Sequence, residues 1–213
     1  MDIEIIKKSV KNLTLRIYPD GKIKLTAPIR TRDEYIKYFL EKKQPWIEKK
    51  LKELKARKIE QISYTTGEQL FFLGKKYNFI LKESKKDFVV KDNFSITLYT
   101  KFPDDYEAKN KIINGWYRGE AEKIFVPILE KYLKLTGKKI EKLTIKTLKR
   151  NWGSCNYKKR HINLNAEMLK KDIKFIEYVI LHEIAHLEHP DHSINFYSYI
   201  EKFMPDWKER KKL

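Results

Sequence analysis

The sequence predicts an α+β protein built from two halves. The N-terminal half is β-rich and carries a helical insert, because apolar and polar residues alternate there between turn signals. Near residue 104 the apolar spacing changes to that of helices. The second half is expected to hold a long helix, a short antiparallel sheet and a histidine-bearing helix. We therefore expect two regions, residues 1–102 and residues 103–213.

The first region opens with a predicted hairpin. Residues 13–17 and 23–27 both alternate, and Asp-Gly between them is a turn signal. Thr31 and Glu34 then match a capping box and predict a helix start. Pro45 is expected to interrupt and restart this helix. Four further strands, predicted as a meander, follow at residues 69–73, 77–82, 88–91 and 94–99.

The second region begins with a long predicted helix. It starts at Asp104 or Asp105 and ends at Gly137, which is a C-cap candidate. Pro127 lies inside it and predicts a kink or a break. Residues 142–149 and 160–165 then read as two strands joined by a turn with the sequence NWGSCNYKK.

The composition excludes several classes of protein. No apolar run reaches the roughly 18 residues of a membrane span, and the N-terminus has no signal-peptide pattern. A single cysteine, Cys155, excludes an internal disulfide framework. Together these features favour a cytoplasmic protein that has no membrane partner.

The chain is strongly basic, with 47 Lys and Arg against 29 Asp and Glu and a net charge of +18. The lysines are spread along the whole chain and no nucleic-acid motif accompanies them. This pattern favours a generally lysine-rich surface. It is also compatible with non-specific nucleic-acid contact or with an anionic substrate.

Residues 172–196 contain four of the five histidines and the pattern HEIAH. His182 and His186 lie four residues apart in a helix-periodic apolar run, so they share one helix face. Two imidazoles at this separation can bind one Zn²⁺ ion at about 2.0–2.1 Å each. Glu183 is placed to reach a zinc-bound water rather than the metal.

The helix that carries this pattern is predicted to begin after Asp172 and to end at Pro190. A catalytic zinc site needs a third protein ligand, and His192 is the best candidate. His189 is interpreted as a solvated or capping histidine near the helix C-terminus.

Three segments with the sequences NWGSCN, HINLNAEML and YVILHEIAHLEHPDHSINFY resemble the YgjP-like metal-dependent hydrolases. That family comprises predicted zinc metallopeptidases related to SprT-like proteases and to zincins. The stretches VKNLTLRIYPDGKIKLTAP, WIEKK and TTGEQLFFLGKKY extend the resemblance over nearly the whole chain. It implies a zincin-like metallopeptidase domain at residues 103–213.

The resemblance also implies roles for individual residues. His182, His186 and His192 would be the ligands of one Zn²⁺ ion, and Glu183 would be the catalytic residue. Family members often carry Arg directly before the Trp of WGSC, whereas this chain has Asn151 there, with Arg150 one place earlier.

Other residues near the motif are candidates for supporting roles. Each ligating imidazole should donate its second N–H to a carboxylate or carbonyl, and three acids lie close in sequence: Glu177, Glu188 and Asp191. Transition-state stabilisation needs a further donor, and the candidates are Arg150, Asn165, Tyr178 and Tyr197. The WGSC stretch has two interpretations. It is either part of the substrate cleft, or structural, with Trp152 and Cys155 buried and Gly153 in a turn.

The sequence therefore predicts a zinc-dependent hydrolase, with a metallopeptidase acting on protein or peptide substrates as the leading hypothesis. A first alternative is hydrolysis of a nucleotide or another phosphorus-containing substrate, although no carboxylate cluster of the kind Mg²⁺ prefers is present. A second alternative is a DNA-associated SprT-like protease or a nucleic-acid-binding module.

Overall fold

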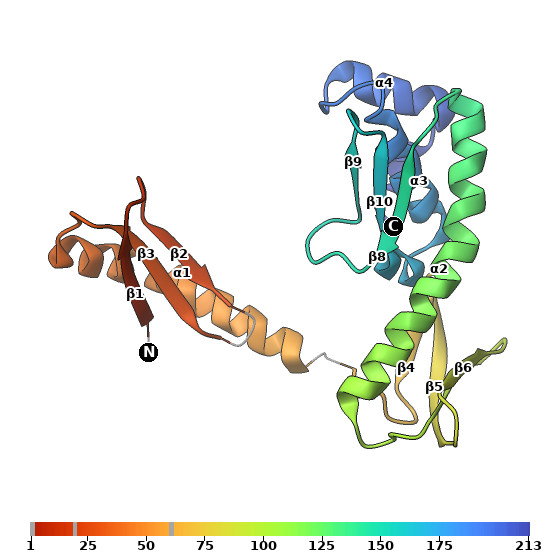
Figure 1. Ribbon diagram of the computed structural model, residues 1–213, viewed down its shortest axis with the longest axis horizontal. Coiled ribbons are helices and arrows are strands. Elements are labelled where there is room, and N and C mark those ends of the chain that lie inside the picture. Colours follow the sequence, from red (N-terminus) through yellow and green to blue (C-terminus); the bar gives the residue numbers. More distant parts are fainter. Residues whose placement is uncertain (1–2, 19–20, 60–61) are drawn as a thin grey trace. The chain divides into compact units, whose positions relative to one another are not determined.

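The computed structural model describes residues 3–18, 21–59 and 62–213, and divides the chain into two compact units (Figure 1). The first unit spans residues 1–62 and the second spans residues 63–213. Helices and three sheets occur together in the described residues, which confirms the α+β class. No helix in the described ranges combines the length and apolar character that crossing a membrane requires.

The first unit is a three-stranded sheet with one long helix. Its elements are β1 (Ile3–Lys8), β2 (Thr14–Ile17), β3 (Ile23–Pro28) and α1 (Asp33–Ile59). The predicted hairpin is confirmed, since β2 pairs antiparallel with β3; Asp20 of its turn lies outside the described residues. The parallel partner β1 was not predicted. Leu25, Ala27 and Ile36 form the buried core between sheet and helix.

Helix α1 runs without interruption through Pro45, so the predicted restart there is wrong. It begins at Asp33, two residues after the predicted cap Thr31. A proline inside a helix removes one backbone hydrogen bond. That single loss is offset by the unbroken helix on either side.

The second unit begins with a four-stranded sheet. Its strands are β4 (Gln69–Phe72), β5 (Lys75–Glu83), β6 (Phe88–Lys91) and β7 (Ser95–Thr100). The strand positions are confirmed, but the meander is wrong because the order is β4-β5-β7-β6 and β5 pairs parallel with β7. Five of the six residues of β7 are buried. Such a strand is covered on both faces, which suits a central position.

Helix α2 (Tyr106–Thr136) joins the two ends of the second unit. As predicted, Asp105 caps its start, accepting a hydrogen bond from the Ala108 N–H at 3.1 Å, and Gly137 ends it with φ +66°. The helix continues through Pro127, so of the two predicted alternatives, a kink or a break, the break is absent. Figure 1 shows β4–β7 beside the first half of α2 and α3 beside the second half.

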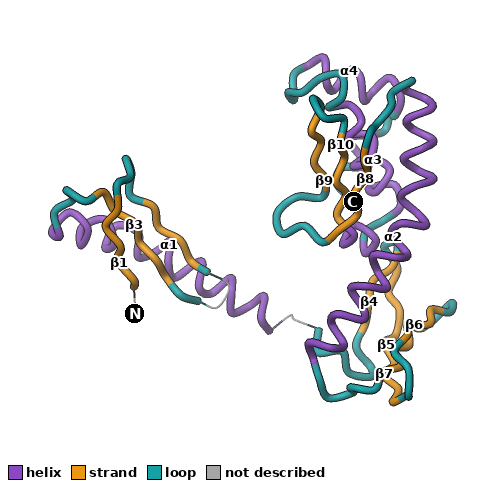
Figure 2. The backbone as a smooth tube through the Cα atoms, in the orientation of Figure 1, coloured by secondary structure: helices purple, strands orange, loops and turns teal. Residues whose placement is uncertain are grey.

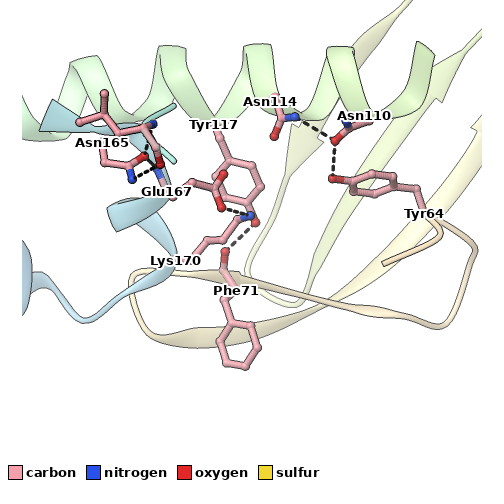
Figure 3. A network of polar contacts seen from close by, with 9 residues as sticks. Tyr64, Phe71, Asn110, Asn114, Tyr117, Asn165, Glu167 and Lys170 are labelled. Atoms are coloured by element: carbon pink, nitrogen blue, oxygen red, sulfur yellow. Dashed lines mark hydrogen bonds and ion pairs between the residues drawn. The ribbon is translucent and has the colours of Figure 1, made fainter. Parts of the chain in front are cut away.

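Within the second unit, the β4–β7 sheet packs against α2 and the 3₁₀ helix η1 (Ala166–Lys170). The buried Tyr117 on α2 donates its hydroxyl hydrogen to the Phe71 carbonyl at 2.6 Å (Figure 3). The Leu73 N–H donates to the Leu169 carbonyl at 2.7 Å. Both bonds join the β4–β7 sheet to later elements of the chain, so the sheet belongs to the second unit. The boundary between the two units therefore falls near residue 62, whereas the sequence analysis placed it at residues 102/103.

A second sheet supports the histidine-bearing helix. Its strands are β8 (Lys142–Lys146), β9 (Gly153–Asn156) and β10 (His161–Asn165), in the order β8-β10-β9. The sheet is mixed rather than antiparallel, because β8 pairs parallel with β10. Strand β9 forms from residues predicted as a turn, after the wide loop that follows β8 (Figure 2).

The remaining elements complete the second unit. They are the 3₁₀ helix η1 (Ala166–Lys170), α3 (Ile173–Ala185), α4 (Ile194–Phe203) and α5 (Trp207–Arg210). Helix α3 contacts β9, β10, α2, α4 and α5. It is therefore the central helix of the C-terminal part.

Candidate metal centre

Helix α3 carries the HEIAH pattern in the predicted frame. Asp172 caps its start by accepting a hydrogen bond from the Lys174 N–H at 2.8 Å. The one-turn spacing of His182 and His186 brings their ring centroids to 4.9 Å. Most of the other residues of the helix are buried, so packing fixes the orientation of both imidazoles.

The helix ends at Ala185, five residues before the predicted end at Pro190. Its last turn tightens into bonds of the i→i−3 type, from the Leu187 N–H to the Ile184 carbonyl and from the Glu188 N–H to the Ala185 carbonyl, each at 3.0 Å. The chain then doubles back, and His192 returns to the two helical histidines.

The three imidazoles converge on one point. The ring centroid of His192 lies 5.0 Å from that of His182 and 4.8 Å from that of His186. The Nε2 atoms of His182 and His192 are 3.1 Å apart, and one nitrogen from each ring lies within 4.8 Å of the others. A tetrahedral zinc ion with ligands at about 2.0–2.1 Å holds its nitrogens about 3.3 Å apart. One metal ion could therefore bind all three rings after small side-chain adjustments.

One buried aromatic ring supports all three histidines. Phe196 on α4 is fully buried, and its ring centroid lies 4.9 Å from His182, 4.7 Å from His186 and 4.9 Å from His192. The sequence analysis assigned no role to this residue. In the sequence, this residue stands out only as a phenylalanine four residues after His192.

The second nitrogen of His186 is held by the backbone. Its Nδ1 lies 3.2 Å from the carbonyl oxygen of His189. A carbonyl only accepts hydrogen bonds, so this contact places the proton on Nδ1 and leaves Nε2 free to bind a metal. Nδ1 of His182 faces the Tyr178 hydroxyl at the longer distance of 3.5 Å.

Two of the three acids suggested for this supporting role, Glu177 and Glu188, have other partners. Glu177 pairs with Lys131 and Arg210, and Glu188 pairs with Lys138. His189 stays outside the cluster, and its ring packs against Tyr199 with centroids 5.6 Å apart.

Burial keeps the helical imidazoles neutral. It lowers the pKa of His182 to about 3, with further contributions from His186, His192 and Lys211. Burial also lowers the pKa of His186. Neutral imidazole is the form that binds a metal ion.

Glu183 lies beside the histidines in a buried position and is only 5% exposed. Its Oε2 is buried without a hydrogen-bond partner among the described residues. Burial raises the pKa of this carboxyl to about 8.

Gly153 at the start of β9 makes room for this carboxyl. A Cβ at that position would lie 2.6 Å from Oε1 of Glu183, well inside the contact distance. Because Gly153 belongs to a strand, the predicted turn is wrong. The glycine is needed for close approach of β9 to α3.

The histidines and Glu183 open into a cavity of about 750 Å³ between the 150–157 stretch, α3 and the turn at residues 190–192. Among the predicted contact residues, Arg150, Trp152 and Tyr178 line the cavity. Trp152 is 41% exposed, so its prediction as a buried residue is wrong. The interpretation of WGSC as part of the cleft fits this position better.

Asn165 and Tyr197 do not line the cavity. The buried Asn165 side chain donates to the Leu148 and Asn151 carbonyls and accepts from the Leu148 and Glu167 N–H groups. It therefore fastens the loop before β9. Tyr197 stacks between His192 and Trp207, with centroids at 6.3 and 4.9 Å.

Cys155 lines the cavity, but its surroundings disfavour the thiolate. Burial, and secondarily the charge of Glu183, raises the pKa of the Cys155 thiol to about 11. Within the described ranges, the one group of three or more histidine, cysteine or acidic side chains with metal-ligand spacing is the histidine trio.

A family model described as YgjP-like, metallopeptidase domain, matches residues 11–213. The chain belongs to this family. The resemblance read from the sequence is thereby confirmed, and with it the class of metal-dependent peptidases. No curated protein matches the chain.

Two solved structures are similar to part of this YgjP-like chain. The crystal structure of the metallopeptidase zymogen of Pyrococcus abyssi abylysin is 26% identical, with a TM-score of 0.38, and the match covers 41% of this chain and 89% of that one. The corresponding zymogen of Methanocaldococcus jannaschii jannalysin is 22% identical, with a TM-score of 0.37, over 41% and 83%.

The structure gives positions to Asn151 and Arg150, where this YgjP-like chain departs from the family pattern. The Asn151 carbonyl accepts a hydrogen bond from the Asn165 side chain at 3.0 Å. Arg150 lines the cavity from one position earlier in the chain.

We expect Gly153→Ala to destabilise the protein by about 1–3 kcal/mol, because the new methyl group would overlap the Glu183 carboxyl. In a Glu183→Ala background the same change should cost much less, and denaturant unfolding of the four variants measures the coupling. Gly119→Ala is the control, since a Cβ there meets nothing within 4 Å. An equal cost in both backgrounds would contradict the steric role assigned to Gly153.

The raised pKa of Glu183 predicts a pH-dependent stability of the metal-free protein. Between pH 4.5 and about 8 the carboxyl ionises in the unfolded chain but stays protonated in the folded one, so rising pH removes stability. Glu183→Gln lacks this loss. The difference in the free energy of unfolding, Glu183→Gln minus wild type, should therefore increase by about 1.4 kcal/mol per pH unit across that window. A difference that stays constant with pH would rule out the burial of an ionisable carboxyl.

Proposed function

We propose that this protein is a zinc-dependent peptidase in which His182, His186 and His192 bind one Zn²⁺ ion and Glu183 is the general base. The observation that carries the proposal is the convergence of three imidazoles beside a buried carboxyl at the base of a cavity. Family membership supplies the reaction class.

The donor set fits zinc. Three imidazole nitrogens with an open side toward the cavity match the arrangement of catalytic zinc sites. The orphaned Oε2 of Glu183 is a second sign that the site is completed by a bound group. When bound, Zn²⁺ would act as a Lewis acid that polarises a carbonyl and acidifies water.

Glu183 supplies the proton transfers. Burial raises the pKa of this carboxyl to about 8 in the absence of metal, and the positive charge of a bound Zn²⁺ ion would lower it, so that the carboxylate could accept a proton from water and return it to the leaving nitrogen. Its neighbours leave it free for this role, because Gly153 adds no side chain and Oε2 has no partner among the described residues.

Strand β9 favours an extended peptide as the substrate. It lies at the edge of the sheet order β8-β10-β9, and its residues Gly153 to Cys155 line the cavity. The free side of an edge strand can pair with a peptide backbone. A peptide bound in this way would run past Glu183 and the histidines.

The alternative substrates have weaker support. A nucleotide or other phosphorus-containing substrate would call for clustered carboxylates, and the described residues offer no such group with metal-ligand spacing. Contact with nucleic acid through the basic surface stays a prediction that rests on the net charge.

Replacing Glu183 by Gln should lower kcat on peptide substrates by about 10²–10⁴-fold, because the general base is lost. Bound zinc should remain stoichiometric, since Glu183 is not a ligand. The test is a digest of a broad protein mixture, read by mass spectrometry, together with metal analysis of both proteins. Undiminished cleavage by the variant would refute the assigned mechanism.

Replacing His192 by Ala should weaken zinc binding by more than about 100-fold, because even the loss of a supporting hydrogen bond costs 10–100-fold. The matched control is His189→Ala, which removes a histidine that packs outside the cluster. Competition with a chelator measures both affinities. Unchanged binding in His192→Ala, with a loss in His189→Ala, would make His189 the third ligand.

A further inference from the structure

Two basic side chains line the cavity in addition to the histidines and Glu183. They are Arg150 and Lys211. Neither forms an ion pair with a carboxylate in the described part of the chain. Other cations near α3 differ, since Lys131 pairs with Glu177 and Lys138 pairs with Glu188. The cavity therefore contains positive charge that the described protein residues do not neutralise.

The backbone of Lys211 is held in place at the end of α5. Its backbone N–H donates to the Trp207 carbonyl at 3.0 Å. The preceding Arg210 is bound to Asp206 at 2.8 Å and to Glu177 on α3. These contacts anchor the end of α5 on the metal-binding helix.

The ammonium group of Lys211 lies over Tyr197, a neighbour of the histidine cluster. It sits 5.9 Å from the ring centroid of Tyr197, and that ring stacks on the ring of His192. Arg150 has no ring or ion-pair contact of this kind with a described residue. Lys211 is therefore the better positioned of the two cations.

A cation beside a site for a divalent metal ion is electrostatically unfavourable unless a negative group joins it. We propose that Lys211 binds an anionic oxygen of the substrate in this cavity, which rests on the proposed peptidase function. Two sources share this chemistry. One is a carboxylate carried by the substrate, and the other is the oxyanion that develops on the scissile carbonyl.

Two peptides that differ only in Glu or Gln beside the scissile bond distinguish these sources. They are tested on the zinc-loaded wild type and on Lys211→Met, Lys211→Arg and Lys208→Met. Lys208 is the matched control, because it belongs to the short helix that ends just before Lys211 and packs over Trp207 without lining the cavity. Dissociation constants for both peptides are also measured in the Glu183→Gln background by Trp fluorescence.

If Lys211 binds a carboxylate, the Glu peptide should bind about tenfold or more tightly than the Gln peptide. Lys211→Met should abolish this difference while leaving the Gln peptide unaffected. If Lys211 binds the oxyanion, Lys211→Met should lower kcat about 100-fold for both peptides at unchanged dissociation constants. Lys211→Arg should recover part of either loss, and Lys208→Met should behave as wild type.

The proposal is overturned if Lys211→Met leaves both kcat and the Glu-to-Gln binding ratio within twofold of the Lys208→Met control. Failure of the proposed function looks different, because the wild type would then cleave neither peptide. In that case tighter binding of the Glu peptide that depends on Lys211 would still support an anion site, and equal binding of the two peptides would overturn it.

Discussion

The convergence of three imidazole nitrogens is the geometric constraint on which the candidate metal centre depends. Helical spacing alone aligns His182 and His186, since four residues make about one turn. The third nitrogen comes from His192, after a chain reversal that follows Ala185. Phe196 contacts all three rings and is fully buried, so the packing of α4 on α3 fixes their relative positions.

The same packing gives Glu183 its chemistry. The carboxyl follows directly after a ligand on the helix, and β9 covers it closely because Gly153 has no side chain. This cover excludes water and raises the pKa of the carboxyl to about 8. The buried Asn165 holds the loop before β9 through three hydrogen bonds to its backbone, so a residue outside the cavity shapes its wall.

The elements that could be predicted are those set by local sequence. Asp105 and Gly137 bound α2 as expected, and the strand positions between residues 69 and 100 agree with their alternation. The order of the strands could not be predicted from local sequence. Strand β7 lies in the interior of its sheet because it is buried on both faces, and this burial depends on the tertiary packing. Pro45 and Pro127 were overestimated as breaks, since a long packed helix tolerates the loss of one hydrogen bond.

The sequence by itself determined the histidine pair, the adjacent glutamate and the family, since all of these lie in short motifs with fixed spacing. The tertiary structure decided which groups surround that motif. Gly153, Trp152 and Lys211 line the cavity, and Lys211 is the residue that follows the last helix. Asn165 lies outside the cavity and hydrogen-bonds to backbone groups instead. The physical reason is range: helical spacing acts over one turn, whereas close approach and burial depend on which distant segments pack together.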